Sequence, residues 1–307
     1  MRYYFAPMEG ITDSIYRRLH HKYFPGVDRY YMPFLSPTVH RSLTSREERE
    51  LPIADTERFV AVPQVLTKVP EDFLWAAKVI RDRGYEEVNL NLGCPSGTVT
   101  AKGKGSGMLS DPAALDRFLE AIFTNAPLPV SVKTRLGATE SDEFCALLEI
   151  YNRYPIKELT IHPRVRKQFY AGAVDMDMFR YAVKNSKNPL CYNGDILSVE
   201  DAGNIAEEFP QLEAVMIGRG LIGDPGMLSP GGTDVKTLEA FCDELLEEYL
   251  VAFGGSRNAM FRLKENWGFL ITRFENSEKL WKKLRKTTDL QEYRSITKEI
   301  FHTLERK

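Results

Sequence analysis

Cys94 lies in a short loop whose composition favours chemistry over packing. The loop, residues 91–96, has the sequence Asn-Leu-Gly-Cys-Pro-Ser, and a tight turn of glycine and proline is an unusual place for a cysteine that only fills a core. A nucleophilic thiolate would need a base beside it, whereas a thiol that keeps its proton near the ordinary pKa of about 8.5 can act as a general acid. We expect Cys94 to be catalytic in one of these two ways.

The other three cysteines are expected to belong to the core, with Cys145 in a helix, Cys191 on a strand and Cys242 in a C-terminal helix. Each cysteine lies more than forty positions from the next, so the chain has no C-x-x-C pair. This spacing argues against a structural zinc site, an iron–sulfur cluster and a disulfide scaffold. We therefore expect no metal.

Lys133 ends a short apolar run, 130–133, that predicts a buried strand. An ammonium group there is costly unless an anionic group lies beside it. Reduced flavin carries negative charge along its N1–C2=O edge and would suit this position, but a lysine that forms a Schiff base would suit it as well.

Gln64 offers the donor and acceptor that the pyrimidine edge of a flavin needs, although a packed amide is equally consistent with the sequence. His162 also ends a predicted strand, and we expect it to contact a cofactor or substrate.

Two glycine turns predict a phosphate site. Asn193, Gly194 and Asp195 follow the seventh predicted strand, while Gly218 and Arg219 follow the eighth. Glycine lets backbone N–H groups approach an anion, and an arginine pairs with phosphate through two hydrogen bonds. The loops after strands seven and eight commonly bind phosphate in a (β/α)8 barrel, so we expect these residues to do the same.

Eight short apolar runs predict the strands that would position these residues. Amphipathic segments lie in most of the gaps between them, as at 73–83 and 143–154. Alternating strands and helices predict a parallel sheet, and eight such units favour a closed (β/α)8 TIM barrel over an open sheet. No glycine-rich dinucleotide motif follows the first strand, which argues against the open sheet. The predicted strands are 3–8, 29–32, 60–66, 87–90, 130–133, 159–162, 190–193 and 214–217.

The carboxyl ends of barrel strands converge on one face. Cys94, Gln64, Lys133, His162 and the two glycine turns would therefore meet there, although they are far apart in the sequence. Pro7, Met8 and Glu9, which end and follow the first predicted strand, would join them. This convergence is the main sequence evidence for one active site.

The pattern changes near residue 232. Glycine and proline cluster at 229–233, and the segments that follow predict helices. We expect a barrel domain at 1–232 and a helical bundle at 233–307. Residues 257–307 contain thirteen Lys or Arg and seven Asp or Glu, although the whole chain has a net charge of −2. A basic tail on an acidic body suggests a polyanionic partner, or simply a solvated helical face.

The composition, 43% hydrophobic and 27% charged, is that of an ordinary globular protein. No apolar run approaches the roughly 20 residues that cross a membrane. The apolar part of the N-terminal segment is too short for a signal peptide. We expect no membrane segment and a cytoplasmic protein.

These motifs resemble the tRNA-dihydrouridine synthases of bacterial type, a flavoprotein family. The resemblance rests on the order and spacing of Ala-Pro-Met at 6–8, the Cys94 loop, Val-Lys-Thr-Arg at 132–135, Ile-His-Pro-Arg at 161–164, Tyr-Asn-Gly-Asp at 192–195 and Ile-Gly-Arg-Gly at 217–220. It implies a TIM barrel with a helical C-terminal domain, FMN as prosthetic group and NADPH as reductant. The FMN contacts that it implies are Pro7, Met8, Glu9, Gln64, Lys133, His162, Asn193, Gly194, Asp195, Gly218 and Arg219.

The resemblance also implies a reaction, the reduction of the C5=C6 bond of a uridine in tRNA. Hydride would pass from flavin N5 to C6, and Cys94 would give a proton to C5. A base in folded tRNA must leave its stack to enter a barrel, and contacts with tRNA phosphates must offset that cost, so that binding weakens with salt. Besides the basic tail, the residues expected to contact tRNA are Asn91, Lys102, Lys104, Arg164 and Arg166.

Three alternatives remain. A flavin barrel for a small molecule, of the dihydropyrimidine or dihydroorotate type, would share the lysine and the phosphate site but would need no basic tail. An aldolase-like enzyme would use Lys133 for a Schiff base and would be colourless as purified. An RNA-binding scaffold without turnover would keep the basic tail and need no flavin.

Overall fold

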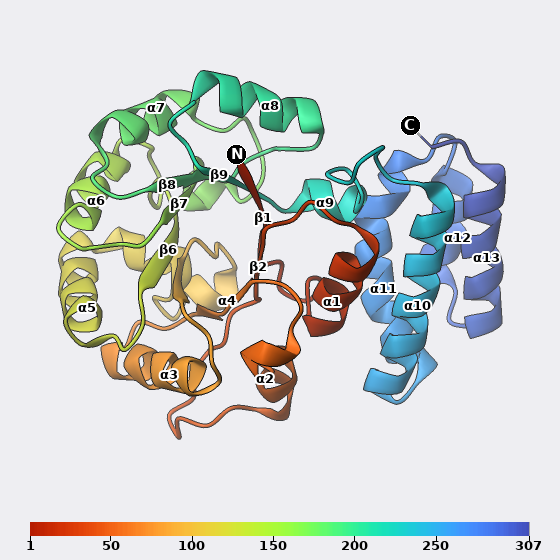
Figure 1. Ribbon diagram of the computed structural model, residues 1–307, viewed down its shortest axis with the longest axis horizontal. Coiled ribbons are helices and arrows are strands. Elements are labelled where there is room, and N and C mark those ends of the chain that lie inside the picture. Colours follow the sequence, from red (N-terminus) through yellow and green to blue (C-terminus); the bar gives the residue numbers. More distant parts are fainter. Residues whose placement is uncertain (307) are drawn as a thin grey trace.

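The computed structural model describes residues 1–306. Nine short parallel strands form a nearly closed barrel with helices around its outside (Figure 1). The strands follow the order β3-β2-β1-β9-β8-β7-β6-β5-β4, so the first and last strands of the chain are neighbours. This confirms the expected TIM-barrel class. The strands are β1 (Arg2–Phe5), β2 (Arg29–Tyr31), β3 (Ala61–Val62), β4 (Gln64–Val65), β5 (Val88–Leu92), β6 (Val130–Arg135), β7 (Leu159–His162), β8 (Leu190–Tyr192) and β9 (Ala214–Ile217).

The predicted third strand, residues 60–66, is divided at Pro63 into β3 and β4. β3 pairs with β2 and β4 pairs with β5, so this one segment connects the two ends of the strand order. Proline has no N–H group to give to a neighbouring strand, while the Pro63 carbonyl accepts from the backbone N–H of Asn89 at 2.8 Å. The change of partner at Pro63 explains why eight predicted strands appear as nine.

Polar side chains cap several helices that cover the barrel. Asp13, Asp111 and Asp175 each accept a hydrogen bond from a backbone N–H in the first turn of the following helix. Ser198 does the same and forms a capping box with Asp201. The helices of this part of the chain are α1 (Ser14–Tyr23), α2 (Ser45–Glu50), α3 (Pro70–Asp82), α4 (Gly97–Thr100), α5 (Pro112–Asn125), α6 (Glu143–Tyr151), α7 (Met176–Asn185), α8 (Val199–Glu208) and α9 (Arg219–Gly223).

The apolar face of α3 illustrates how these helices pack. Phe73, Ala76, Ala77 and Ile80 recur at helical spacing, and all four are buried in the main core. Burial of a side chain as large as Phe73 or Ile80 contributes about 1.5–3 kcal/mol. Gly84 follows the helix with a φ of +89°, a left-handed conformation that favours glycine and stops the helix.

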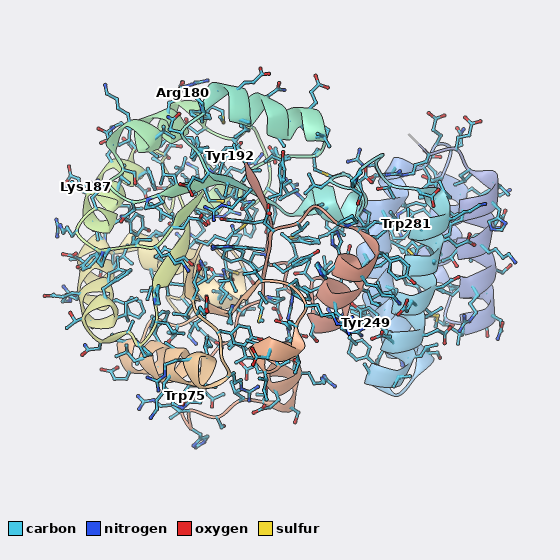
Figure 2. All side chains as sticks on the ribbon, in the orientation of Figure 1. Trp75, Arg180, Lys187, Tyr192, Tyr249 and Trp281 are labelled. Atoms are coloured by element: carbon cyan, nitrogen blue, oxygen red, sulfur yellow. The ribbon has the colours of Figure 1, made fainter. Side chains whose placement is uncertain are left out.

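Four helices follow the barrel and lie on one side of it, next to α1 and α9 (Figure 1). Phe241 packs edge-on against Tyr16 and Phe24, with ring centroids 5.5 and 5.3 Å apart. Tyr249, at the contact between this helical part and α1 (Figure 2), donates to the Asp13 carboxylate at 3.0 Å. The C-terminal helices therefore share the core of the barrel. They are α10 (Val235–Phe253), α11 (Ser256–Leu270), α12 (Glu278–Lys286) and α13 (Leu290–Thr303).

Within residues 1–306, every helix is too short or too polar to cross a membrane. The most basic helix is α12, where Lys279, Lys282, Lys283, Arg285 and Lys286 are exposed while Leu280 and Leu284 are buried. Its positive charge therefore faces solvent.

Candidate active site

A cavity of about 840 Å³ opens at the carboxyl ends of the barrel strands. It gathers all the predicted site residues except Arg164 and Arg166. The predicted residues that line it are Pro7, Met8, Glu9, Gln64, Asn91, Cys94, Lys102, Lys104, Lys133, His162, Asn193, Gly194, Asp195, Gly218 and Arg219. The structure therefore brings together residues from all parts of the barrel, and the ligand contacts expected of each remain predictions.

The Cys94 loop is held by hydrogen bonds on both sides. Asn91 Oδ1 accepts from the backbone N–H groups of Gly93 and Cys94, at 3.1 and 2.9 Å. The Cys94 carbonyl accepts from Ser106, whose hydroxyl oxygen lies 2.8 Å away. Gly105 approaches the same loop so closely that a Cβ on it would lie 2.9 Å from the Cys94 carbonyl oxygen, and its φ is +57°. The glycine-rich segment after the cysteine therefore shapes the loop.

Burial raises the pKa of the Cys94 thiol, and the positive charges of Arg135 and Lys133 lower it in part. The thiol consequently keeps its proton at neutral pH, as a general acid requires. The other cysteines lie elsewhere: Cys191 is buried, and Cys145 and Cys242 are half-buried in α6 and α10. Among residues 1–306, no three His, Cys, Asp or Glu side chains are placed to hold a metal ion.

Lys133 lies on β6 at the cavity and forms no ion pair with another described residue. Its low-dielectric surroundings and the nearby guanidinium of Arg135 lower the pKa of the ammonium to about 7. Because no carboxylate lies beside this ammonium, a negatively charged ligand group would gain more binding free energy here than next to a cation that is already paired.

His162 is buried at the end of β7, and its Nε2 lies 3.1 Å from Nη1 of Arg164. A guanidinium can only donate, so Nε2 accepts and Nδ1 carries the hydrogen of the neutral ring. Burial, followed by the charges of Arg135 and Lys133, lowers the pKa of His162 well below its ordinary value. The imidazole is therefore neutral and has one defined tautomer.

Arg164 corrects an expectation from the sequence. The sequence predicts that this residue contacts tRNA, but it is only 1% exposed. Its Nη1 donates to Asp195 Oδ1 at 3.0 Å and its Nη2 donates to the Gly172 carbonyl at 2.5 Å. The loop after β7 turns this side chain toward Asp195 and His162, so that it orients both groups. Arg166, two positions on, is half-buried and donates to Ser110 Oγ at 3.0 Å.

The expected phosphate corner is crowded around its glycines. A Cβ at Gly194 would lie 2.9 Å from Val174 Cγ1 and 3.0 Å from Tyr192 Oη. Arg219 donates to Asp195 Oδ1 at 2.7 Å. Two arginines thus share one carboxylate, which leaves a net positive charge where the turns after β8 and β9 face the cavity.

Two aromatic residues at the cavity were missed by the sequence analysis. Phe169 and Tyr170 lie in the loop after β7 and are 51% and 48% exposed. The guanidinium groups of Arg135 and Arg219 lie 5.4 and 5.1 Å from the centre of the Tyr170 ring. Two adjacent aromatic residues in a predicted loop were the only sequence signal for a ligand contact here. Nothing in the sequence shows that this loop folds over the cavity.

Three comparisons with known proteins extend this picture. The family model "Dihydrouridine synthase (Dus)" matches residues 4–306. The tRNA-dihydrouridine synthase B of Pasteurella multocida is 30% identical over 226 residues, which is 73% of this chain and 67% of that protein. A probable tRNA-dihydrouridine synthase of Rhizobium leguminosarum is 30% identical over 283 residues, 88% of this chain and 84% of that protein.

Among solved structures, morphinone reductase has a similar fold. Its TM-score is 0.54 at 11% identity, and the match covers 77% of this chain and 88% of that one. At such low identity the likeness concerns the barrel alone. The match to the family model over nearly the whole sequence, together with the two relatives, establishes that this chain belongs to the dihydrouridine synthase family.

Proposed function

We propose that this protein is a tRNA-dihydrouridine synthase that uses FMN and NADPH to reduce the C5=C6 bond of a uridine in tRNA. The observation that carries the proposal is that a protonated thiol, Cys94, and an ammonium without an anionic partner, Lys133, line one cavity at the carboxyl ends of the strands. Family membership and the names of the relatives support the choice of tRNA as substrate.

The residues of the cavity fit FMN. The ammonium of Lys133 suits the N1–C2=O edge of the ring, and Gly194, Gly218 and Arg219, which line the cavity, would form a cationic corner for the phosphate. His162, Asn193, Asp195, Gln64 and the segment Pro7–Glu9 complete the surrounding wall. FMN bound here would receive hydride from NADPH and supply it to C6 of the uracil.

Cys94 would deliver the proton that C5 needs. Its thiol is protonated at neutral pH, and Arg135 and Lys133 would stabilise the thiolate that remains after transfer. Asn91 shapes this loop through its Oδ1, and one hydrogen of its Nδ2 is left for the uracil base. Gln64 and Asn91 are hydrogen-bonded at 2.7 Å, so the flavin-binding and base-binding amides would be placed relative to each other.

The tRNA would bind mainly through phosphates. Lys102 and Lys104 lie at the cavity, and Lys104 Nζ lies 3.1 Å from Ser36 Oγ. Arg166 and the exposed cations of α12 would extend this basic surface. In this proposal residues 1–232 form the catalytic barrel, and the helical part at 233–307 binds tRNA. With tRNA as its substrate, the protein would act in the cytoplasm.

The test is reduction of unmodified tRNA by the FMN-loaded protein with NADPH, followed by quantification of dihydrouridine after nuclease digestion. Dihydrouridine is expected with tRNA and not with free uridine. Equal turnover of free uridine would instead favour a flavin barrel for small molecules. Absence of flavin binding would remove the proposal altogether.

A further inference from the structure

A chain of hydrogen bonds crosses the barrel interior from the Cys94 loop to the opposite end of the strands. Asn91 Nδ2 donates to Gln64 Oε1 at 2.7 Å, and Gln64 Nε2 donates to Asn89 Oδ1 at 2.7 Å. Asn89 Nδ2 donates to Ser131 Oγ at 2.9 Å, and Ser131 Oγ donates to Glu87 Oε1 at 2.5 Å.

The strand register places these residues side by side. Gln64 on β4 is opposite Asn89 on β5, and Asn89 is opposite Ser131 on β6. Gln64, Asn89 and Ser131 are fully buried, and Asn91 and Glu87 nearly so. A barrel interior packs as well with apolar side chains, so a continuous polar chain here calls for a reason beyond packing.

At both ends of this hydrogen-bond chain the roles of donor and acceptor are fixed. At one end the backbone N–H groups of Gly93 and Cys94 can only donate, so Asn91 must present its oxygen to them. At the other end Glu87 accepts from Arg29 at 3.2 Å and from Lys157 at 2.7 Å, which keeps it a carboxylate that can only accept from Ser131.

The interior then has one consistent arrangement. Because Ser131 gives its proton to Glu87, it accepts from the amide nitrogen of Asn89, whose oxygen in turn faces Gln64. Gln64 consequently directs its oxygen to Asn91 and keeps one N–H and one lone pair for the cavity. Reversing any one amide would place two donors or two acceptors against each other.

We propose that Glu87, Ser131 and Asn89 are positioning residues, which fix the amide orientation of Gln64 and Asn91 and thereby the shape of the Cys94 loop. None of the three lines the cavity. Their effect on uridine reduction rests on the function proposed above, whereas their effect on the Cys94 loop does not.

Two substitutions disconnect the hydrogen-bond chain from the carboxylate of Glu87 at its end. Ser131→Ala leaves the amide nitrogen of Asn89 without an acceptor. Glu87→Gln keeps the size of the side chain but offers both a donor and an acceptor, so it no longer dictates which way the chain points. Arg29 and Lys157 are partly exposed, which lets water replace their lost partner and allows the variant to fold.

Glu158→Gln is the matched control. Glu158 is as deeply buried as Glu87 and lies at the same end of the barrel, just before β7. It accepts from Tyr4 Oη at 3.1 Å and Tyr31 Oη at 3.3 Å and takes no part in the chain. Its substitution removes a buried carboxylate without removing any hydrogen bond of the chain.

The experiment measures alkylation of Cys94 by iodoacetamide in flavin-free protein, followed by mass spectrometry of the Cys94 peptide with the Cys145 peptide as internal reference. Ser131→Ala and Glu87→Gln are expected to change the Cys94 rate by about fivefold, the size of effect that the net loss of one hydrogen bond gives. Glu158→Gln is expected to leave that rate unchanged. Equal rates in all four proteins, or the same change in Glu158→Gln, would overturn the proposal.

In the FMN-loaded enzyme, the first two variants should lower kcat for tRNA reduction about tenfold and leave KM for tRNA unchanged, since the basic surface is intact. A change in KM alone would contradict a positioning role. If the wild-type protein does not reduce tRNA, the function proposed above fails, and the alkylation rates still decide whether the chain orients the loop.

Discussion

Arg164 Nη1 lies 3.1 Å from Nε2 of His162, the last residue of β7, and only one residue separates the two in the sequence. The same guanidinium holds Asp195 after β8, so one buried cation sets the tautomer of the imidazole and the position of the carboxylate that binds Arg219. This relationship connects the lysine side of the cavity with the proposed phosphate corner.

Arg164→Met is therefore expected to weaken FMN binding at least about tenfold and to lower the free energy of unfolding by about 1–3 kcal/mol, because it removes one of the two arginines that donate to Asp195 and the donor to the His162 imidazole. Flavin fluorescence titration and urea unfolding measure the two effects. Arg166→Met is the matched control. It removes the same guanidinium group only two positions along the sequence from Arg164, and this group donates to Ser110 and not to Asp195. Equal FMN affinity in both variants would contradict the positioning of Asp195 by Arg164.

Cys94→Ala is expected to retain FMN and the oxidation of NADPH but to reduce tRNA about 10²–10⁴-fold more slowly, the usual contribution of a general acid. The measurement is single-turnover reoxidation of the reduced enzyme by tRNA. Cys145→Ala, which lies in α6 outside the cavity, should behave as wild type. Unchanged dihydrouridine formation in Cys94→Ala would remove the acid role.

The lowered pKa of Lys133 has a consequence for stability. The folded pKa of about 7 lies below the ordinary 10.5, so burial of the ammonium costs free energy at low pH, where it is protonated in both states. That cost declines as the pH rises from 7 and vanishes above 10.5. Lys133→Met should stabilise the flavin-free protein by up to about 5 kcal/mol at pH 6 and by only about 1 kcal/mol at pH 10.

Urea unfolding of variant and wild type at both pH values checks the difference. Lys167→Met, which removes an exposed lysine paired with Glu140, should give no comparable pH dependence. A gain from Lys133→Met that is the same at pH 6 and pH 10 would show that the ammonium is not penalised in the fold.

Replacing Lys282, Lys283 and Lys286 of α12 by glutamine should weaken tRNA binding and reduce its salt dependence, since each lost phosphate contact lowers the slope of log K against log salt by roughly 0.7–0.9. Binding is measured by filter retention at several salt concentrations. Lys184→Gln with Lys187→Gln removes exposed charge at α7 and the turn after it, and Lys187 lies on the side of the barrel away from the C-terminal helices (Figure 2). This control should bind as wild type, and equal losses in both would contradict a specific role for α12.

These charge substitutions are preferable to removal of the whole helical part. Tyr16 and Phe24 are almost fully buried, and Phe241 of α10 packs against both of them. Deletion of residues 235–307 would expose these rings to water, so a loss of tRNA binding could not be separated from a damaged barrel.

The sequence by itself predicted the barrel and most of the polar residues that line its cavity. Local apolar runs and helical periodicity depend on nearby residues, and they predicted the strands, the buried face of α3 and the position of each polar residue at a strand end. Once the fold class is a barrel, geometry requires those ends to meet, which is why Cys94, Lys133 and His162 could be assigned to one cavity.

The tertiary structure alone decided how individual polar side chains are used. The sequence predicts a tRNA contact for Arg164, yet the residue is buried, since the direction of a side chain after a strand depends on the path of its loop and on partners such as Asp195. The division of a strand at Pro63 and the place of Tyr170 over the cavity have the same origin. Nor can local pattern reveal that Glu87 and Cys94 lie at the two ends of one hydrogen-bond chain, because that chain exists only after three strands have aligned in register.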